Sequence, residues 1–496
     1  MGIIQRQGIR NTFVTYFGIM IGFLNLIVLQ PYLLKPEEIG LIRVLFSFSS
    51  LIAVMLPLGA TSVTIRFFPL FREQDKQHHG FFGFILLFPL IGFVVSSVFL
   101  FVLKDFFIAQ YINNSKLFTE YYNYVIPFSF ILGLITVLNT YSFSLFRTTI
   151  PSVLNDIFAR LGTMAVISAY YLQLISLQFF VIYFIGVSGI QLIVLVIYIF
   201  KIDKPKIIPN VDFLKKQNLP EIFGYGLLVS LASISSLGLK YIDAIMIGKY
   251  MSLSFVGVYT IAAFIPALIE APIASLEKIS TTKIASALAI DNMQEIKEIY
   301  FKSCRYLFLL GGWLFLGINI NISALLHLLP EAYHGGGKVV LLISLGALLN
   351  MLAGANSSII FSSKHYKFGA FLLVFIAVLA FLFNVLLIPM FGMEGAALAT
   401  LLSTFIYALM RFVFIRVKFK LMPYDIKTIL TALLILICFL INHLIPELNS
   451  PIADILMRSV IITVLYFSGT FLLKIVPEFH MYIPGIAKRK NPGEDS

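Results

Sequence analysis

Charged side chains inside long apolar stretches are the residues of this chain that are best placed to do chemistry. Arg43 and Arg66 lie near the two ends of the apolar stretch 39–68, which Pro57 and Gly59 interrupt. An arginine at the centre of a membrane helix costs about 2.5–3.5 kcal/mol on insertion scales, so it normally faces protein or water. Its guanidinium stays charged, and its planar fork matches phosphate oxygens. We therefore predict that this stretch lines a path for an anionic group.

Further basic residues extend this pattern. Arg66, Arg147 and Arg160 are predicted at the cytoplasmic ends of three spans, where a ring of arginines could receive a pyrophosphate. Alternatively, Arg66, Arg147 and Arg160 are anchors that reach the membrane surface. Lys240 precedes Asp243 by three residues, so the two would share a helix face and could form an ion pair. The predicted substrate-binding residues are Arg43, Arg66, Arg147, Arg160 and Lys240.

Acidic residues inside the predicted spans fall in the second half of the chain. Glu270 lies between Pro266 and Pro272, where we expect the helix to be broken, and Glu277 stands near the inner end of the same span. An intramembrane carboxylate is a candidate for ion or proton coupling, because protonation changes its desolvation cost. Glu270, Asp243 and Glu277 are therefore the predicted coupling residues. The alternatives are a neutral Glu270 that stabilises the kink and an Asp243 in a structural ion pair.

Other kinds of site find no support in the sequence. His327 and His334 flank a predicted outer loop without the spacing of metal ligands, and no nucleotide-binding motif occurs. The outer loops are short and show no paired carboxylates suited to glycosyl transfer, which argues against a membrane polymerase or glycosyltransferase. We expect no enzyme activity, no metal and no cofactor. Whether a proton or sodium gradient drives the protein stays open.

Membrane-spanning helices are the elements that must position these residues. Of 496 residues 59% are hydrophobic and 12% are charged, and the mean hydropathy is +0.95. Soluble domains carry about 25% charged residues, so we predict an all-α membrane protein. A span needs about 20 apolar residues. This rule predicts about fourteen spans: 10–34, 39–65, 81–103, 121–145, 157–174, 178–200, 222–248, 254–277, 299–321, 338–361, 366–388, 395–416, 425–444 and 453–474.

Basic residues predict how the chain is oriented in the membrane. The net charge is +12, with 36 lysines and arginines. We assign Arg43, Lys240 and Arg411 to the interior of predicted spans, and most of the other basic residues fall in loops or at span ends on the side that is predicted to be cytoplasmic. Such a bias places both termini in the cytoplasm. The excess of basic residues in cytoplasmic loops also accounts for the positive net charge, so this charge does not indicate binding to nucleic acid.

An internal repeat organises the predicted spans. The segment 35–59 can be laid over 252–276, with Gly40 opposite Gly257. Corresponding helices that proline interrupts in two halves of a transporter point to a binding site at the repeat interface. The predicted domains are an N-terminal lobe of six spans at 1–200, a cytoplasmic connector at 201–221, a C-terminal lobe of six spans at 222–416, and two extra spans with a cytoplasmic tail at 417–496.

Four blocks of sequence resemble one known family. They are IPMFGMEGAALAT at 388–400, YIDAIMIGKYMSLSFVGVYTIAA at 241–263, LGATSVTIRFF at 58–68 and NSSIIFSSKHYKFGAF at 356–371. The chain thereby resembles the Wzx-type oligosaccharide flippases of polysaccharide biosynthesis, which belong to the superfamily of multidrug and oligosaccharidyl-lipid exporters. The resemblance implies two six-helix lobes around a central cavity, two additional C-terminal helices, and alternating access.

The resemblance also implies a substrate and a location. Its cargo would be a polyprenyl-pyrophosphate-linked oligosaccharide, such as an O-antigen, capsule or exopolysaccharide repeat unit, moved from the cytoplasmic to the outer leaflet. Its surroundings would be the lipids of the bacterial cytoplasmic (inner) membrane and polysaccharide polymerase machinery. Proton-driven drug exporters of the superfamily are expected to use an acid in the N-terminal lobe, which this chain lacks there. The alternatives are an ion-coupled small-molecule or drug antiporter of the same fold and a lipid II flippase.

Overall fold

Helices make up all the regular structure in the part of the chain that the computed structural model describes, residues 3–217 and 219–475. Within these residues, twelve helices are long and apolar enough to cross a membrane, and the bent pair α14 (Leu253–Phe264) and α15 (Ala267–Ala289) makes thirteen. The helix α20 (Tyr366–Lys418) has 53 residues. At about 1.5 Å per residue it is more than twice as long as a bilayer core of about 30 Å. Gly392 interrupts it with a non-helical φ of 59°, so α20 supplies two spans and the predicted fourteen are accounted for.

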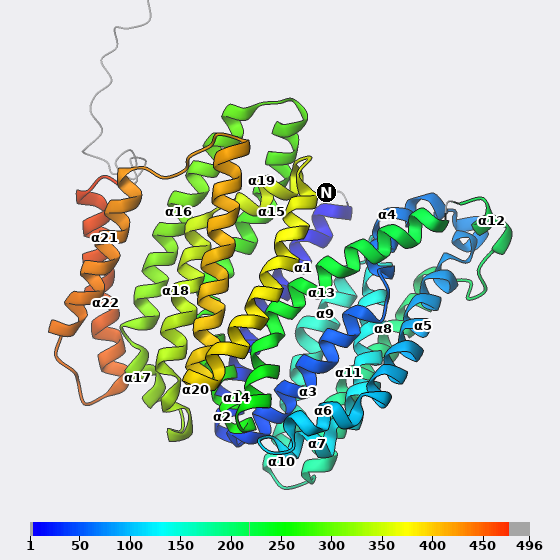
Figure 1. Ribbon diagram of the computed structural model, residues 1–496, viewed down its shortest axis with the longest axis horizontal. Coiled ribbons are helices and arrows are strands. Elements are labelled where there is room, and N and C mark those ends of the chain that lie inside the picture. The colour runs from blue at the N-terminus through cyan, green and yellow to red at the C-terminus, as the bar shows by residue number, and fades with distance from the viewer. Residues whose placement is uncertain (1–2, 218, 476–496) are drawn as a thin grey trace, which may run out of the picture. The chain divides into compact units, whose positions relative to one another are not determined.

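Two compact units divide the chain, and each is described by itself. The first comprises Met1–Ile261 and Ala370–Ala399. In it α3 packs against α8 and α13, while α11 packs against α8 and α10 (Figure 1). Its helices are α1 (Ile3–Phe23), α2 (Gln30–Leu33), α3 (Pro36–Met55), α4 (Ala60–Phe71), α5 (Phe81–Val102), α6 (Lys104–Tyr111), α7 (Lys116–Tyr121), α8 (Val125–Ser144), α9 (Thr149–Val153), α10 (Ala159–Tyr171), α11 (Leu177–Asp203), α12 (Val211–Lys215), α13 (Leu219–Tyr250), most of α14 and the first part of α20.

The second unit comprises Ala262–Gly369 and Thr400–Ser496. Here α16 packs against α15, α18 and α21, and α21 lies beside α22 (Figure 1). Its other helices are α15, α16 (Met293–Asn319), α17 (Ile322–His327), α18 (Gly337–Ala353), α19 (Asn356–Ser362), the second part of α20, α21 (Ile426–Ile441) and α22 (Pro451–Leu472). These units reflect contacts within the fold, whereas the predicted lobes rest on the sequence repeat and stay a prediction.

Exposed apolar side chains indicate the surface that meets lipid. Soluble monomers rarely expose apolar patches larger than a few hundred Å². The helix α5 has apolar side chains on its exposed surface as well as on its buried face. The buried face packs into a phenylalanine-rich core with α4, α8 and α11. The exposed side chains of α5 include Leu87, Leu90, Ile91, Val94, Val95, Val98 and Phe99.

The interruptions predicted in the second and eighth spans are both present. The helix α3 ends at Met55, and α4 starts after a turn in which Gly59 has a φ of +85°. A β-carbon on Gly59 would lie 2.2 Å from the carbonyl oxygen of Gly226, so this turn requires glycine. In the eighth span the break falls between Phe264 and Ala267, at Pro266. Pro272 lies inside α15, six residues after Pro266, so Glu270 belongs to the first turn of that helix and does not lie in the break.

Gly40 and Gly257, which the repeat places opposite each other, make reciprocal contacts. A β-carbon on Gly40 would lie 1.9 Å from the carbonyl oxygen of Leu253. A β-carbon on Gly257 would lie 2.0 Å from the carbonyl oxygen of Pro36. Leu253 is the residue that the repeat aligns with Pro36. The two helix starts therefore meet through equivalent backbone surfaces, as in a two-fold interface, which supports the repeat.

We expect Gly40→Ala and Gly257→Ala each to lower the free energy of unfolding by about 1–3 kcal/mol, because the added methyl group meets backbone that cannot rotate away. Thermal and denaturant unfolding of the purified protein in detergent would measure this. Gly186→Ala is the matched control, since a β-carbon there meets nothing within 4 Å. Unchanged stability in both variants would contradict the close approach.

Candidate functional site

Arg43 lies on α3, which packs against α13 in the first unit. The side chain is half-buried, and its guanidinium carbon lies 5.7 Å from the centre of the Tyr241 ring. The Nε atom is buried and has no hydrogen-bond partner among the described residues. The ionisable side chains of Tyr259 and Asp243 lie within electrostatic range of the guanidinium. Arg43 therefore keeps a donor free beside a cluster of polar groups.

Asp243 forms the centre of that cluster. Its side chain is 8% exposed. One carboxylate oxygen accepts a hydrogen bond from the Tyr259 hydroxyl, and the other accepts one at 3.0 Å from the amide of Asn384 on α20. Neutral donors thus satisfy a buried carboxylate that would otherwise be very unfavourable. The site that results has an acid, an arginine and two tyrosines within one unit.

Lys240 points elsewhere. It is exposed, and its ammonium nitrogen lies 5.5 Å from the centre of the Tyr241 ring. Asp243, three residues later, is buried against Tyr259 and Asn384. Lys240 and Asp243 were predicted to share a helix face, but the side chain of Lys240 is exposed and that of Asp243 is buried.

Arg66 is paired across the first unit. On α4 it lies 3.5 Å from the carboxylate of Glu221 at the start of α13, and its guanidinium stacks 4.4 Å from the centre of the Tyr225 ring. Both charged side chains are about half exposed. An exposed ion pair contributes only about 0–1 kcal/mol. An anionic ligand could therefore replace Glu221 at Arg66 at little cost.

Arg147 and Arg160 have separate surroundings. Arg147 is exposed and lines a cavity of about 320 Å³ with Arg72, His78 and Asp203. Arg160 is half-buried, and its Nη1 donates a hydrogen bond to the carbonyl oxygen of Gly18 on α1. Arg160 thereby ties α10 to α1. Arg66, Arg147 and Arg160 thus have different neighbours, and a ring of arginines that receives a pyrophosphate stays a prediction.

A second polar cluster lies in the second unit around Arg411, a residue that the sequence placed inside a span without a role. Arg411 is only 4% exposed. Its Nη1 donates to the hydroxyl of Ser357, and its Nη2 donates to the amide oxygen of Asn350 at 3.1 Å. The guanidinium lies 3.9 Å from the centre of the Tyr407 ring. Arg411 therefore holds α18, α19 and α20 together.

The same asparagine reaches the predicted coupling acid. The amide nitrogen of Asn350 donates to Glu270 at 3.1 Å, so Glu270, Asn350 and Arg411 form one chain of hydrogen bonds. Glu270 is exposed on α15, and Glu277 is half-buried further along that helix. Glu277 lies within electrostatic range of both Arg411 and Glu270. Two carboxylates thus share one buried cation, and a proton on either acid balances the charge of the cluster.

The contacts within these two polar clusters could not be predicted from sequence patterns. Asn350 and Arg411 are 61 positions apart, and Asp243 and Asn384 are 141 positions apart. The asparagines are uncharged, so a search for intramembrane charge passes over them. The signal for Arg411 was present, because a charge inside a span normally marks a function or a pairing partner.

Comparisons with known proteins find membrane proteins similar to this chain. No family model matches the chain. An uncharacterized membrane protein of Methanocaldococcus jannaschii is 22% identical over 468 residues, which cover 88% of this chain and 89% of that protein. Probable flippase AglR of Haloferax volcanii is 28% identical over 186 residues, and this match spans 38% of that protein and 36% of this chain.

Solved structures share the fold. The lipid II flippase MurJ, in an inward closed conformation, superimposes with a TM-score of 0.75 at 14% identity, over 94% of this chain and 98% of that one. An inward-facing multidrug resistance MATE transporter of the MOP superfamily gives a TM-score of 0.63 at 14% identity, over 81% of this chain and 94% of that one. The chain is therefore a multi-span membrane protein with the fold of MurJ, which is named as a flippase, and of the MATE transporters.

Proposed function

We propose that this protein flips a polyprenyl-pyrophosphate-linked oligosaccharide from the cytoplasmic to the outer leaflet of the cytoplasmic membrane by alternating access. The proposal includes both termini in the cytoplasm and a glycan of the O-antigen, capsule or exopolysaccharide type, as in the Wzx-type flippases. Polysaccharide polymerase machinery would receive the product. No cofactor is required for such a movement, because no covalent bond changes.

The observation that carries the proposal is the free donor of Arg43. A buried polar group without a partner costs about 1–3 kcal/mol, and more when it is charged. The Nε of Arg43 has no partner among the described residues, and the guanidinium packs on Tyr241 rather than on a carboxylate. A pyrophosphate supplies acceptor oxygens in the planar arrangement that a guanidinium binds best. Arg43 is therefore suited to hold the anionic head of the cargo.

The similar proteins support the same class of cargo. AglR is named as a probable flippase, and MurJ is named as a flippase of lipid II. The fold alone also fits a small-molecule antiporter, since MATE transporters share it. A cation as cargo would meet Arg43 and Arg66 unfavourably, because both are permanently positive. The charge in the first unit thus favours an anionic cargo.

Coupling is assigned to the acids. Glu270 is exposed on a helix that belongs to a candidate membrane span, and a carboxylate at such a position normally faces a water-filled cavity. Its chain through Asn350 to Arg411 lets a proton or a sodium ion change the contacts of α18 and α20. Asp243, held by Tyr259 and Asn384, is a second acid that could bind a cation. The carboxylate of Glu277 is a further negative charge within electrostatic range of the Arg411 guanidinium.

We expect Glu270→Gln to flatten the pH dependence of transport. Glutamine keeps the size of the side chain and can still bind Asn350, but it cannot exchange a proton. Initial rates in liposomes between pH 5 and pH 8, with and without an imposed proton gradient, would measure this. Glu298→Gln is the control, because Glu298 is exposed on α16 and pairs with Lys302 at 2.6 Å. A pH profile of Glu270→Gln that matches the wild type would leave this acid a structural role.

The function itself is tested by offering different cargoes to the purified protein in liposomes. We expect a fluorescent polyprenyl-pyrophosphate glycan to change leaflet only when the protein is present. Organic cations and lipid II serve as rival cargoes in parallel vesicles. Movement of the cations alone would establish a drug antiporter instead, and movement of lipid II alone would establish a lipid II flippase.

A further inference from the structure

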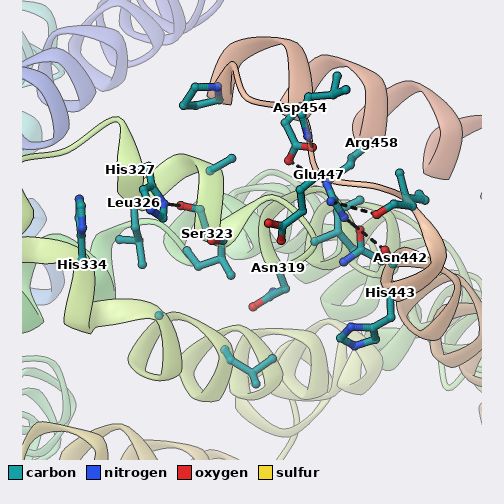
Figure 2. A pocket seen from close by; sticks show the side chains of 18 of the residues that line it. Asn319, Ser323, Leu326, His327, His334, Asn442, His443, Glu447, Asp454 and Arg458 are labelled. Carbon is teal, nitrogen blue, oxygen red and sulfur yellow. Dashed lines mark hydrogen bonds and ion pairs between the residues drawn. The ribbon is translucent and has the colours of Figure 1, made fainter.

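A polar pocket lies in the second unit, away from the residues described so far. It has a volume of about 790 Å³, within the range of about 300–1,000 Å³ that is typical of small-ligand sites. The end of α16, the short helix α17, the start of α18 and the α21–α22 hairpin surround it (Figure 2). In the predicted topology all of these segments lie on the outer face.

Asn319, at the end of α16, is directed into this pocket (Figure 2). The side chain is 6% exposed. Its amide nitrogen donates to the carbonyl oxygen of Phe315 at 2.9 Å, and its amide oxygen has no partner among the described residues. A buried oxygen without a donor costs about 1–3 kcal/mol. Asn319 therefore presents an acceptor to whatever occupies the pocket.

Two histidines on the other side add further acceptors. The rings of His327 and His334 lie 5.0 Å apart. His327 donates from Nδ1 to the carbonyl oxygen of Ser323 at 2.7 Å, and His334 donates from Nε2 to that of Leu329 at 3.0 Å. Each ring must therefore carry its proton on the nitrogen that is already used. In the neutral form, the second nitrogen of each ring is an acceptor.

The α21–α22 hairpin is held rigidly beside these groups. Arg458 is 5% exposed. Its donors reach Asp454 at 2.8 Å, the side chain and backbone of Asn442, and the carbonyl oxygens of Ile445 and Pro446. Arg458 thus has its hydrogen-bonding capacity used within the hairpin, and it acts as a positioning residue. It fixes the loop that carries Glu447, whose exposed carboxylate lines the pocket.

Apolar groups complete the lining. Phe439 of α21 is half-buried, and the ring of His443 stands edge-on to it with the ring centres 6.2 Å apart. Leu326 and Leu341 also line the pocket. An aromatic ring beside hydrogen-bond acceptors fits a ligand with an apolar face and a rim of hydroxyl groups. Among common ligands, a sugar has this combination.

We propose that this pocket binds a carbohydrate, with sugar hydroxyls donating to Asn319, His327, His334 and the Glu447 carboxylate. The source of that carbohydrate, the glycan of the transported lipid as it emerges on the outer face, rests on the proposed function. The pocket itself does not, since a free oligosaccharide would fill it equally well. Such a site would keep an emerging glycan from returning through the protein.

The test is a glycan array probed with the purified full-length protein in detergent, followed by isothermal titration with the free form of the best-bound oligosaccharide. Hydrogen bonds to a charged group contribute enough for at least about tenfold in affinity. We expect Glu447→Gln to weaken binding by at least that factor, and Asn319→Leu, which removes a neutral acceptor, to weaken binding about two- to tenfold. Glu331→Gln is the matched control, because Glu331 is exposed in the nearby loop and does not line the pocket.

Folding of the variants can be followed independently. Trp313 is the one tryptophan of the chain and lies on α16, where its Nε1 donates to Thr463 of α22 at 3.0 Å. Its fluorescence spectrum therefore reports whether α16 and α22 still pack. Glu447→Gln changes an exposed residue and keeps the test valid if Asn319→Leu misfolds.

Each remaining outcome has a definite meaning. The proposal would be overturned if the wild-type protein bound no oligosaccharide more strongly than the Asn319→Leu variant does. Binding that both pocket variants retain would place the carbohydrate elsewhere. Spermidine, a ligand with several ammonium groups, would be tested in the same titration. Tight binding of spermidine together with no binding of any glycan would overturn the proposal, because the acceptors of the pocket would then bind an ammonium ligand. Glycan binding by a wild-type protein that flips no lipid-linked glycan would keep this pocket and remove the proposed transport function.

Discussion

Arg43→Ala is expected to slow flipping of a pyrophosphate-linked glycan by at least about a hundredfold without unfolding the protein. A hydrogen bond to a charged group contributes about 1.5–3 kcal/mol, and a bidentate contact to pyrophosphate would lose two of them. Stability should change little, because the Nε of Arg43 has no partner to lose among the described residues. The initial rate of flipping in liposomes measures the effect.

Two companion variants sharpen this prediction. Arg43→Lys keeps the charge but loses the planar fork, so we expect it to retain only part of the rate. Arg10→Ala removes an exposed arginine from α1 and should leave the rate unchanged. A normal rate for Arg43→Ala, with a normal rate for Arg10→Ala, would remove Arg43 from the cargo site.

Arg411→Ala is expected to reduce the free energy of unfolding by about 3–5 kcal/mol, which is typical for breaking a buried charged network by removing one member. The change leaves Asn350 and Ser357 without their donor and Glu277 without a nearby cation. Denaturant unfolding of the purified protein in mixed micelles measures the loss.

Arg416→Ala serves as the control on the same helix, because Arg416 is exposed near the end of α20. We also expect Arg411→Lys to recover part of the stability, since a lysine can bind one of the two partners at a time. Equal stability of Arg411→Ala and Arg416→Ala would mean that the hydrogen bonds around Arg411 contribute nothing.

The sequence was informative where a property repeats over many residues. About 20 consecutive apolar residues specify a span, so the fourteen predicted spans match the helices, with α20 divided at Gly392. Pro57 and Pro266 showed that two spans are interrupted, because proline removes a backbone donor and clashes with the preceding turn. The repeat placed Gly40 opposite Gly257, and these two glycines meet equivalent backbone segments.

Contacts between side chains that are far apart in the sequence could not be predicted from such repeating properties. Arg66 was predicted to bind cargo, but its pairing with Glu221, 155 positions later in the sequence, could not be predicted. The Asn350 that joins Glu270 to Arg411 has no charge and no periodic pattern. Arg458 received no functional prediction from the sequence, although it is buried and organises a hairpin. Such contacts depend on how helices pack, and packing is not encoded in local composition.

The most direct measurement compares one fluorescent glycan on two lipid carriers, polyprenyl pyrophosphate and an uncharged polyprenol, in liposomes that contain the wild-type protein. Accessibility of the glycan to a membrane-impermeant reagent reports its leaflet. We expect rapid protein-dependent flipping of the pyrophosphate-linked glycan and slow flipping of the uncharged one, because Arg43 binds the anionic head. Equal rates for the two carriers, or no flipping of either, would contradict a flippase that recognises pyrophosphate.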